Sequence, residues 1–193
     1  MLASRSFASA LALALLQPTQ GAYYYHYSAT DGWPTPEDAL KAVKKDTDAR
    51  GIPVRYAQWD DWWYSQKGGD VGGLLEWQPR KAIFPSGLTD WLAPWKTSLY
   101  VAMYSPGNIY AKPPYSYRWK VDDTHHALPM DQAFYDDLFA NGSKADMVMF
   151  EQDFLCTHNV GTHLTNRDVT TGDTWFRNMD AAAQKANVSL QFW

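Results

Sequence analysis

The sequence is poor in cysteine and in clustered positive charge. Cys156 is its only cysteine, so no disulfide bond can form within the chain. The 17 Lys and Arg residues are outnumbered by 21 Asp and Glu residues, and the formal net charge is −4. Nucleic-acid binding needs clustered Lys and Arg, whereas Lys41, Lys44 and Lys45 have the spacing of a solvated helix face. We therefore expect no nucleic-acid partner.

Long hydrophobic runs are missing too. The apolar run Phe7–Leu16 is too short to span a membrane, and it follows Arg5 as in a secretory signal peptide. We expect residues 1–21 to be a signal peptide, with a disordered leader as the alternative. The mature protein would then be secreted or lie in the lumen of the secretory pathway, with no membrane span. In a eukaryotic secretory route, the sequons at Asn141 and Asn187 would permit N-glycosylation and make it a glycoprotein.

Patterns that bind nucleotides or metals are also absent. No glycine-rich phosphate loop follows the first predicted strand, and the spacing of Gly68-Gly69 and Gly72-Gly73 is not a nucleotide fingerprint. His158 and His163 are five residues apart, but no third ligand can be named beside them. We expect no cofactor and no metal.

Aromatic residues, in contrast, are abundant. They make up 16% of the chain, with ten Trp and twelve Tyr. Sugar-binding sites use such residues because the C–H faces of a pyranose pack on flat rings while Trp N–H and Tyr O–H groups still form hydrogen bonds. The composition therefore favours a carbohydrate ligand, with an aromatic-rich core as the alternative.

Segments typical of strands alternate with segments typical of helices. The length of 193 residues suits one domain, and 46% hydrophobic with 20% charged residues is typical of a globular chain. The alternation predicts strands at residues 22–27, 53–59, 98–104, 146–152 and 188–193. It predicts helices from Thr35 to Gly51 and at residues 86–96, 131–140 and 172–186.

The lengths of the connections predict an α/β fold with a parallel sheet. Long segments follow the strands, at residues 60–85, 105–130 and 153–171, and the helix-to-strand connections are short. This asymmetry is typical of a (β/α) TIM-type barrel, whose active-site loops leave the C-terminal ends of the strands. We expect residues 22–193 to form a partial barrel, truncated after about five βα units. A partner or a missing C-terminal part would then complete it.

The fourth predicted strand ends in two acids. Period-two alternation places Met147, Met149, Glu151 and Asp153 on one face, and the residues between them on a face that suits the outer helices. In a barrel, the acidic end opens into the active site. The alternative is a pair of solvated loop carboxylates.

The second predicted strand ends in a similar way. Asp60 and Asp61 follow it and are flanked by Trp59, Trp62 and Trp63. Adjacent carboxylates can hold vicinal sugar hydroxyls while rings stack on the sugar. The alternative is that the acids cap a loop and the indoles pack in the core.

The sequence resembles a family through four motifs in a set order. They are Asp60-Asp61-Trp62, Gly73-Leu-Leu-Glu-Trp77, Phe84-Pro-Ser-Gly-Leu88 and Glu151-Gln-Asp153. In this order they resemble the retaining α-galactosidases and raffinose-synthase-like glycoside hydrolases, and most closely an uncharacterised secreted eukaryotic branch related to them. The resemblance covers roughly residues 22–193, the N-terminal part of the family's barrel.

The resemblance implies roles for individual residues. Asp153 occupies the position of the catalytic nucleophile, and Trp77 belongs to a loop that borders the pocket in relatives. The expected substrate-binding residues are Asp60, Asp61, Trp62, Trp77, Tyr104 and Glu151, where Tyr104 closes the third predicted strand.

Two departures from the family change the expected activity. The α-galactosidases usually carry Lys two residues before the nucleophile, where this chain has Glu151, so an added negative charge should raise the pKa of one acid of the pair. The family's acid/base follows the sixth strand, which this chain does not reach. We expect a glycoside hydrolase-like protein that acts on or binds α-linked sugars, inactive as this chain alone. A non-catalytic carbohydrate-binding protein is the alternative.

Overall fold

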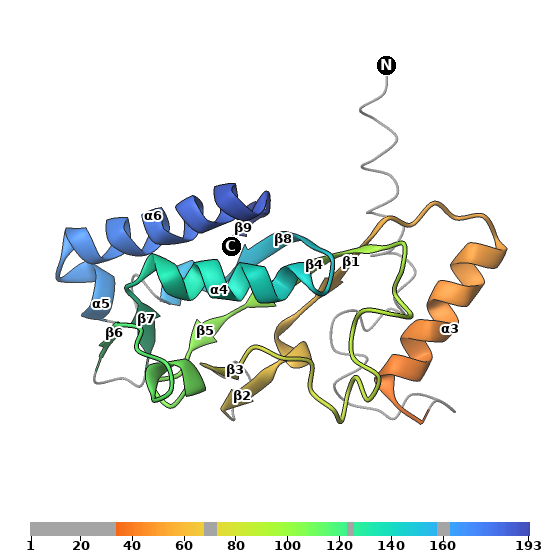
Figure 1. Cartoon of the computed structure of the whole chain (residues 1–193), viewed down its shortest axis with the longest axis horizontal. Coiled ribbons are helices and arrows are strands. Elements are labelled where there is room, and N and C mark those ends of the chain that lie inside the picture. Colours follow the sequence, from red (N-terminus) through yellow and green to blue (C-terminus); the bar gives the residue numbers. More distant parts are fainter. Residues whose placement is uncertain (1–33, 68–72, 123–125, 158–162) are drawn as a thin grey trace, which may run out of the picture. The chain divides into compact units, whose positions relative to one another are not determined.

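A computed structural model describes residues 34–67, 73–122, 126–157 and 163–193 (Figure 1). The chain divides into two compact units, Met1–Ala57 with Pro79–Lys96, and Gln58–Gln78 with Thr97–Trp193. The predicted signal peptide, the first predicted strand, Gly68-Gly69, Gly72 and His158 lie outside the described residues.

The first unit is built around helix α3 (Pro36–Ala49). Its N-cap is Thr35, whose hydroxyl oxygen accepts a hydrogen bond from the Asp38 amide at 3.2 Å, and Pro36 occupies the first helical position. Gly51 follows the helix with a φ of +65°, which a side chain would strain. The helix and both its boundaries are therefore as the sequence predicts.

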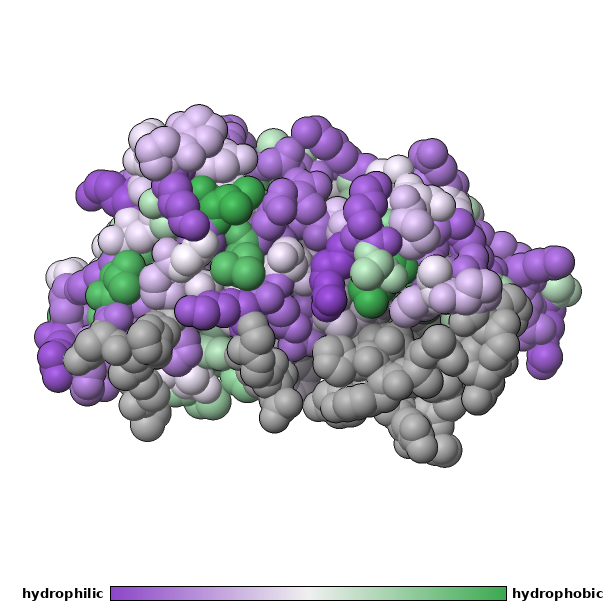
Figure 2. Space-filling view, turned by 90° about the horizontal axis from the view of Figure 1, so that it is seen from below, coloured by the Kyte–Doolittle hydropathy of each residue, from purple (hydrophilic) through white to green (hydrophobic). Residues whose placement is uncertain are grey.

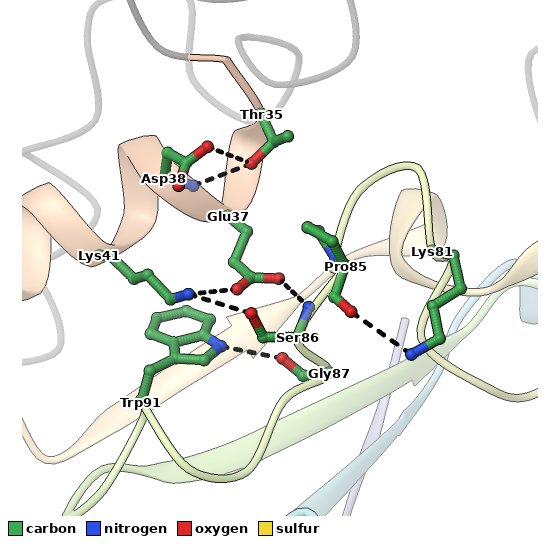
Figure 3. A network of polar contacts seen from close by, with 9 residues as sticks. All are labelled: Thr35, Glu37, Asp38, Lys41, Lys81, Pro85, Ser86, Gly87 and Trp91. Carbon is green, nitrogen blue, oxygen red and sulfur yellow. Dashed lines mark hydrogen bonds and ion pairs between the residues drawn. The ribbon is translucent and has the colours of Figure 1, made fainter.

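The Phe84-Pro-Ser-Gly-Leu88 motif is tied to α3 through Glu37 (Figure 3). The Glu37 carboxylate, 1% exposed, accepts hydrogen bonds from the Ser86 amide at 2.8 Å and from the Lys41 ammonium. Burial alone would raise the Glu37 pKa, but these donors hold it below its ordinary value. Gly87, with a φ of +83°, accepts a hydrogen bond from the Trp91 indole at 2.8 Å. The motif therefore has a structural task in this unit.

The predicted helix at residues 86–96 is wrong. The segment forms successive turns instead. Gly87 is in a left-handed conformation that a helix does not contain, and Pro94 has no N–H to donate to a helical hydrogen bond.

A sheet with the strand order β1-β4-β8-β9 lies mostly in the second unit. Its strands are β1 (Tyr56–Trp59), β4 (Lys96–Val101), β8 (Met147–Gln152) and β9 (Ser189–Phe192). The pairs β4–β8 and β8–β9 are parallel. Four predicted strands thus pair in chain order, which confirms a mixed α/β fold with a parallel sheet.

Two helices pack against this sheet and against each other. They are α4 (Gln132–Ser143) and α6 (Val169–Ala186), preceded by the short α5 (His163–Asn166) (Figure 1). Phe134, Tyr135 and Phe139 of α4 are buried, and the Phe139 ring lies 5.1 Å from that of Phe150 on β8. The Trp175 indole of α6 donates a hydrogen bond to the Tyr135 hydroxyl at 2.6 Å. Much of the aromatic content therefore serves the core.

A second sheet combines the end of the predicted strand 98–104 with segments that the sequence predicts as loops. It comprises β2 (Ser65–Lys67), β3 (Gly73–Glu76), β5 (Met103–Tyr104), β7 (Ala127–Pro129) and β6 (Trp119–Val121), in the order β2-β3-β5-β7-β6. Only the β3–β5 pair is parallel among the pairings described. Strands of two to four residues are too short to show a period in the sequence. A closed TIM-type barrel is not shown by the described residues, which form two sheets.

The face of the molecule shown in Figure 2 is mostly hydrophilic. On the face shown in Figure 2, hydrophobic residues lie in small separate areas among hydrophilic ones. Within the described ranges, no helix is both long enough and apolar enough to cross a bilayer.

Candidate functional site

The two acids at the end of β8 lie on the face opposite the helices. Phe150 points to α4, and Gln152 is fully buried, with its amide nitrogen donating to the carbonyl oxygens of Val101 and Ala102. Glu151 and Asp153 alternate with these two residues and bond instead to side chains of β1 and β4. The predicted alternation is therefore confirmed for this end of the strand.

The alternation fails at the other end of β8. Met147 was expected on the face of the acids, and this is wrong. A Cβ on Gly142 of α4 would lie 2.9 Å from the Met147 sulfur, which places Met147 on the helix side. The register explains the difference, because Thr97 pairs with Met147 but Ser98 pairs with Met149. Val148 is skipped, and the faces exchange at this irregularity.

Glu151 is held by a residue two strands away. It is 4% exposed, and its carboxylate accepts a hydrogen bond from the Gln58 side-chain amide on β1. Tyr100 on β4 is the register partner of Glu151, and β4 lies between β1 and β8 in the sheet. Gln58, Tyr100 and Glu151 therefore form one polar row across the face of three strands.

Asp153 accepts hydrogen bonds on both carboxylate oxygens. The Tyr100 hydroxyl donates to Oδ2 at 2.6 Å, and the Phe154 amide donates to Oδ1 at 2.5 Å. The Asp153 amide itself donates to the Val101 carbonyl at 3.0 Å, which keeps this residue in line with the sheet. Phe154 then turns the chain with a φ of +56°. The carboxylate is thus oriented by two donors just beyond the strand end.

Asp60 lies at the equivalent end of β1. Its Oδ1 accepts a hydrogen bond from the Asp61 amide at 2.6 Å and caps the short 3₁₀ helix η2 (Asp61–Trp63). Asp60 and Asp61 are each partly exposed. The alternative interpretation of these acids as loop caps is therefore correct for Asp60, and capping leaves its other oxygen as an acceptor.

The charges of these acids act on one another. Burial, and then the charges of Asp60 and Asp153, raise the pKa of Glu151 to about 7. Burial and the charge of Asp153 also raise the pKa of Asp60, although the Asp61 amide acts in the opposite direction. The prediction that Glu151, in the place of the family's Lys, would raise the pKa of one acid of the pair agrees with the raised pKa of Glu151, although burial is the larger cause. Three carboxyl groups from two strand ends thus form one electrostatic cluster, which we call the carboxyl cluster (Asp60, Glu151 and Asp153).

Three aromatic residues expected at the substrate are buried. Trp62 is 3% exposed, Trp77 is 2% exposed and Tyr104 is fully buried. The Trp77 ring packs at 5.1 Å from that of Trp63, and the Tyr104 hydroxyl donates to the Gln152 side chain at 3.0 Å. These rings offer almost no free surface for stacking in this structure, and they support the site by packing.

Tyr100 and Gln58 belong to the site but were not predicted. The sequence predicts residues 98–104 as one strand ending at Tyr104. The structure divides this segment at Ala102 into β4 and β5, which lie in different sheets. The Ala102 amide donates to the Tyr64 hydroxyl at 3.1 Å, a side-chain partner where a continuous strand would have a backbone one. The residue near the sheet end is therefore Tyr100.

Metal-binding side chains and the cysteine were also considered as candidates from the sequence. Within the described ranges, no set of three His, Cys, Asp or Glu side chains is arranged to hold a metal ion. The single cysteine, Cys156, is exposed.

The fold, in which a parallel sheet carries acids at its strand ends, is similar to that of solved α-galactosidases. Neither a protein-family model nor a curated protein matches the chain. The α-galactosidase TtGalA from Thermus thermophilus, solved in complex with stachyose, is similar with a TM-score of 0.54 at 14% identity, over 89% of this chain and 38% of that chain. A variant of the GH36 α-galactosidase AgaA from Geobacillus stearothermophilus, solved with raffinose, is similar with a TM-score of 0.54 at 16% identity. This match covers 82% of this chain and 25% of that chain. The chain thus spans well under half the length of these relatives, and the similarity establishes the fold.

Proposed function

We propose that this chain belongs to a glycoside hydrolase-like protein that acts on or binds α-linked sugars at the carboxyl cluster. The observation that carries the proposal is the meeting of Asp60, which follows β1, with Glu151 and Asp153 at the C-terminal end of β8 in the same sheet. Ligands of α/β enzymes bind at these ends. The sugars bound by the similar α-galactosidases, stachyose and raffinose, support the choice of α-linked sugars as ligands.

The cluster has the chemistry that sugar hydroxyls require. A hydroxyl both donates and accepts a hydrogen bond, so it pairs well with carboxylate acceptors that lie beside donors. Asp61 and the second oxygen of Asp60 can accept, and the amide of Gln58 can donate. With a pKa of about 7, the Glu151 carboxyl is partly protonated at neutral pH and can do either.

In this proposal Asp153 is the nucleophile of a retaining reaction. Its carboxylate would attack the anomeric carbon while a carboxylic acid on the other side of the glycosidic bond protonates the leaving oxygen. Glu151 is two residues away on the same face of the same strand, so it cannot supply that proton from the opposite side. We therefore propose that the 193-residue chain by itself binds sugar with little or no turnover.

A non-catalytic sugar-binding protein is the second candidate. The observation that favours it is the pair of hydrogen bonds to Asp153 from Tyr100 and the Phe154 amide, because donors on both oxygens weaken a carboxylate as a nucleophile.

A location in the secretory pathway is also a proposal. Mass spectrometry of the mature N-terminus from a eukaryotic host would test it, and a chain that begins at Met1 would contradict it.

The test is a calorimetric titration of the whole chain with methyl α-galactoside and with raffinose. We expect binding to weaken about tenfold in Asp153→Asn and in Glu151→Gln. Asp173→Asn, at an exposed acid of α6, is the matched control and should bind as the wild type does. Absence of binding in the wild type, or unchanged affinity in both site variants, would refute the proposal.

Turnover is measured separately with a 4-nitrophenyl α-galactoside. If the whole chain releases nitrophenol and Asp153→Asn abolishes this release, the proposal of binding without turnover is refuted and the chain is catalytic. Sugar binding without release of nitrophenol in either protein is the outcome that both candidates give for this chain.

A further inference from the structure

A second aromatic hollow lies outside the carboxyl cluster. Its volume is about 150 Å³, and it lies between helix α4 and the segment that contains the 3₁₀ helix η3 (Ile109–Ala111). The lining residues are Tyr110, Tyr115, Tyr117, Phe134, Asp137, Leu138, Ala140 and Asn141. None of them belongs to the carboxyl cluster. We call this hollow the tyrosine pocket.

One wall of the tyrosine pocket is a row of phenol rings. The rings of Tyr115 and Tyr117 are stacked, with centroids 5.7 Å apart and planes at 23°. Tyr110 lies 5.1 Å from Tyr115 and is 8% exposed, whereas Tyr115 is 38% exposed. Phe134 lies against both Tyr110 and Tyr117 and is buried. Tyr115 is thus the most exposed ring of this row, and it is supported by the partly exposed Tyr117 and the buried Tyr110.

The other wall is one side of α4 and carries polar groups. Asp137 and Asn141 are four residues apart, so they lie on the same helix face. Asp137 accepts a hydrogen bond from the Tyr117 hydroxyl through Oδ2, and its Oδ1 is a further acceptor. The Asn141 oxygen accepts from the Lys144 ammonium at 2.8 Å, which directs its amide nitrogen, a donor, to other partners.

We propose that the tyrosine pocket binds a single pyranose ring, separately from the carboxyl cluster. An exposed ring face opposite an acceptor and a donor matches a sugar, which offers a C–H face on one side and hydroxyls on the other. Pockets for drug-sized ligands measure about 300–1,000 Å³, so this volume suits one ring. An anion is disfavoured because no Lys or Arg lines the pocket. A quaternary ammonium could use the rings and Asp137 but leaves the donor of Asn141 unused.

The sugar has two possible sources with the same chemistry. One is a free saccharide, and the other is the N-acetylglucosamine of a glycan attached to Asn141, which begins a sequon at the edge of the pocket. Protein produced in bacteria carries no such glycan, so it tests the free sugar. Mass spectrometry of protein from a eukaryotic secretory host reports whether Asn141 is modified.

The experiment is a two-dimensional NMR titration of the bacterially produced whole chain with methyl α-galactoside and N-acetylglucosamine. We expect shifts of the backbone amides of Tyr110, Tyr115 and Tyr117 and of residues 137–141. Tyr115→Ala should weaken this binding about tenfold, while Tyr115→Phe, which keeps the ring face, should bind within about twofold of the wild type. Asp137→Asn, which can still accept from Tyr117, should weaken it about threefold. Asp173→Asn is again the matched control.

The readout is local, so the two proposals fail independently. Shifts at residues 110–117 without shifts near Gln58 and Glu151 would support the tyrosine pocket and refute the proposed function. No shift at residues 110–117 and 137–141 with either sugar would overturn the tyrosine pocket. Equal affinity in Tyr115→Ala, or shifts of these amides by tetramethylammonium and not by sugars, would overturn it as well.

Discussion

The Tyr100 hydroxyl donates a hydrogen bond to Oδ2 of Asp153 at 2.6 Å and joins the ends of two neighbouring parallel strands. Burial and the adjacent carboxylate raise the pKa of Tyr100, so it remains a donor at any ordinary pH. The tyrosine therefore holds the proposed nucleophile in one orientation.

Removing this donor should cost stability. In Tyr100→Phe the ring remains but Oδ2 of Asp153 loses the hydroxyl, and we expect the free energy of unfolding to fall by about 1–2 kcal/mol. Urea denaturation followed by circular dichroism measures it. Tyr56→Phe, at a tyrosine that is 56% exposed, is the control and should unfold as the wild type does. Equal stability of the two variants would show that the hydrogen bond contributes nothing.

The raised pKa of Glu151 makes stability depend on pH. Its folded-state pKa of about 7 lies above the ordinary value of 4.5, so between these values the folded protein holds a proton that the unfolded chain releases. The contribution of Glu151 to the free energy of unfolding is therefore fully present below about pH 4.5 and is lost as the pH rises through 7. The total change is about 3 kcal/mol.

Glu151→Gln removes this titration. Relative to the wild type, the variant should be more stable at pH 8 than at pH 4, and urea denaturation across that range measures the difference. Glu76→Gln, at an exposed acid of β3, should show no such trend. A wild-type carboxyl signal of Glu151 that titrates near 4.5 in NMR would contradict the prediction.

Two glycines should respond to alanine with opposite signs. A Cβ on Gly87 meets no atom within 4 Å, so Gly87→Ala isolates the strain of its φ of +83° and should lower the free energy of unfolding by about 1–2 kcal/mol. Gly172 lies inside α6 with the nearest atom at 3.9 Å, and Gly172→Ala should raise it by up to about 1 kcal/mol. Thermal unfolding of both variants tests the pair. A stabilising effect at Gly87 would mean that the turn can change its conformation.

Variants of Trp77 distinguish a role in core packing from a contact with the ligand. Its indole donates to the Tyr100 carbonyl at 3.4 Å and packs on Trp63 and Phe150. Trp77→Ala should cost about 3–5 kcal/mol of unfolding free energy, as is typical of a buried Trp. Trp77→Phe, which keeps a ring in the core, should leave the affinity for methyl α-galactoside unchanged in the calorimetric titration. A large loss of affinity in Trp77→Phe at preserved stability would restore Trp77 to the substrate.

The sequence alone determined those features that depend on near neighbours along the chain. The start of α3 at Thr35 and Pro36, and the placement of Glu151 and Asp153 opposite Phe150, follow from capping and from period-two alternation, which act over a few residues. The position of Glu151 near a strand end was also predictable, because it directly follows the apolar run Met147–Phe150.

Only the tertiary structure decided which strand ends meet and which rings stay exposed. The division of residues 98–104 at Ala102 depends on Tyr64 and Gln152, which are far away in the sequence, and it places Tyr100 at the site and Tyr104 in the core. Likewise, the count of Trp residues in the sequence is the same whether their ring faces are exposed or covered. The exposure of each ring is set by long-range packing, and no local pattern records that.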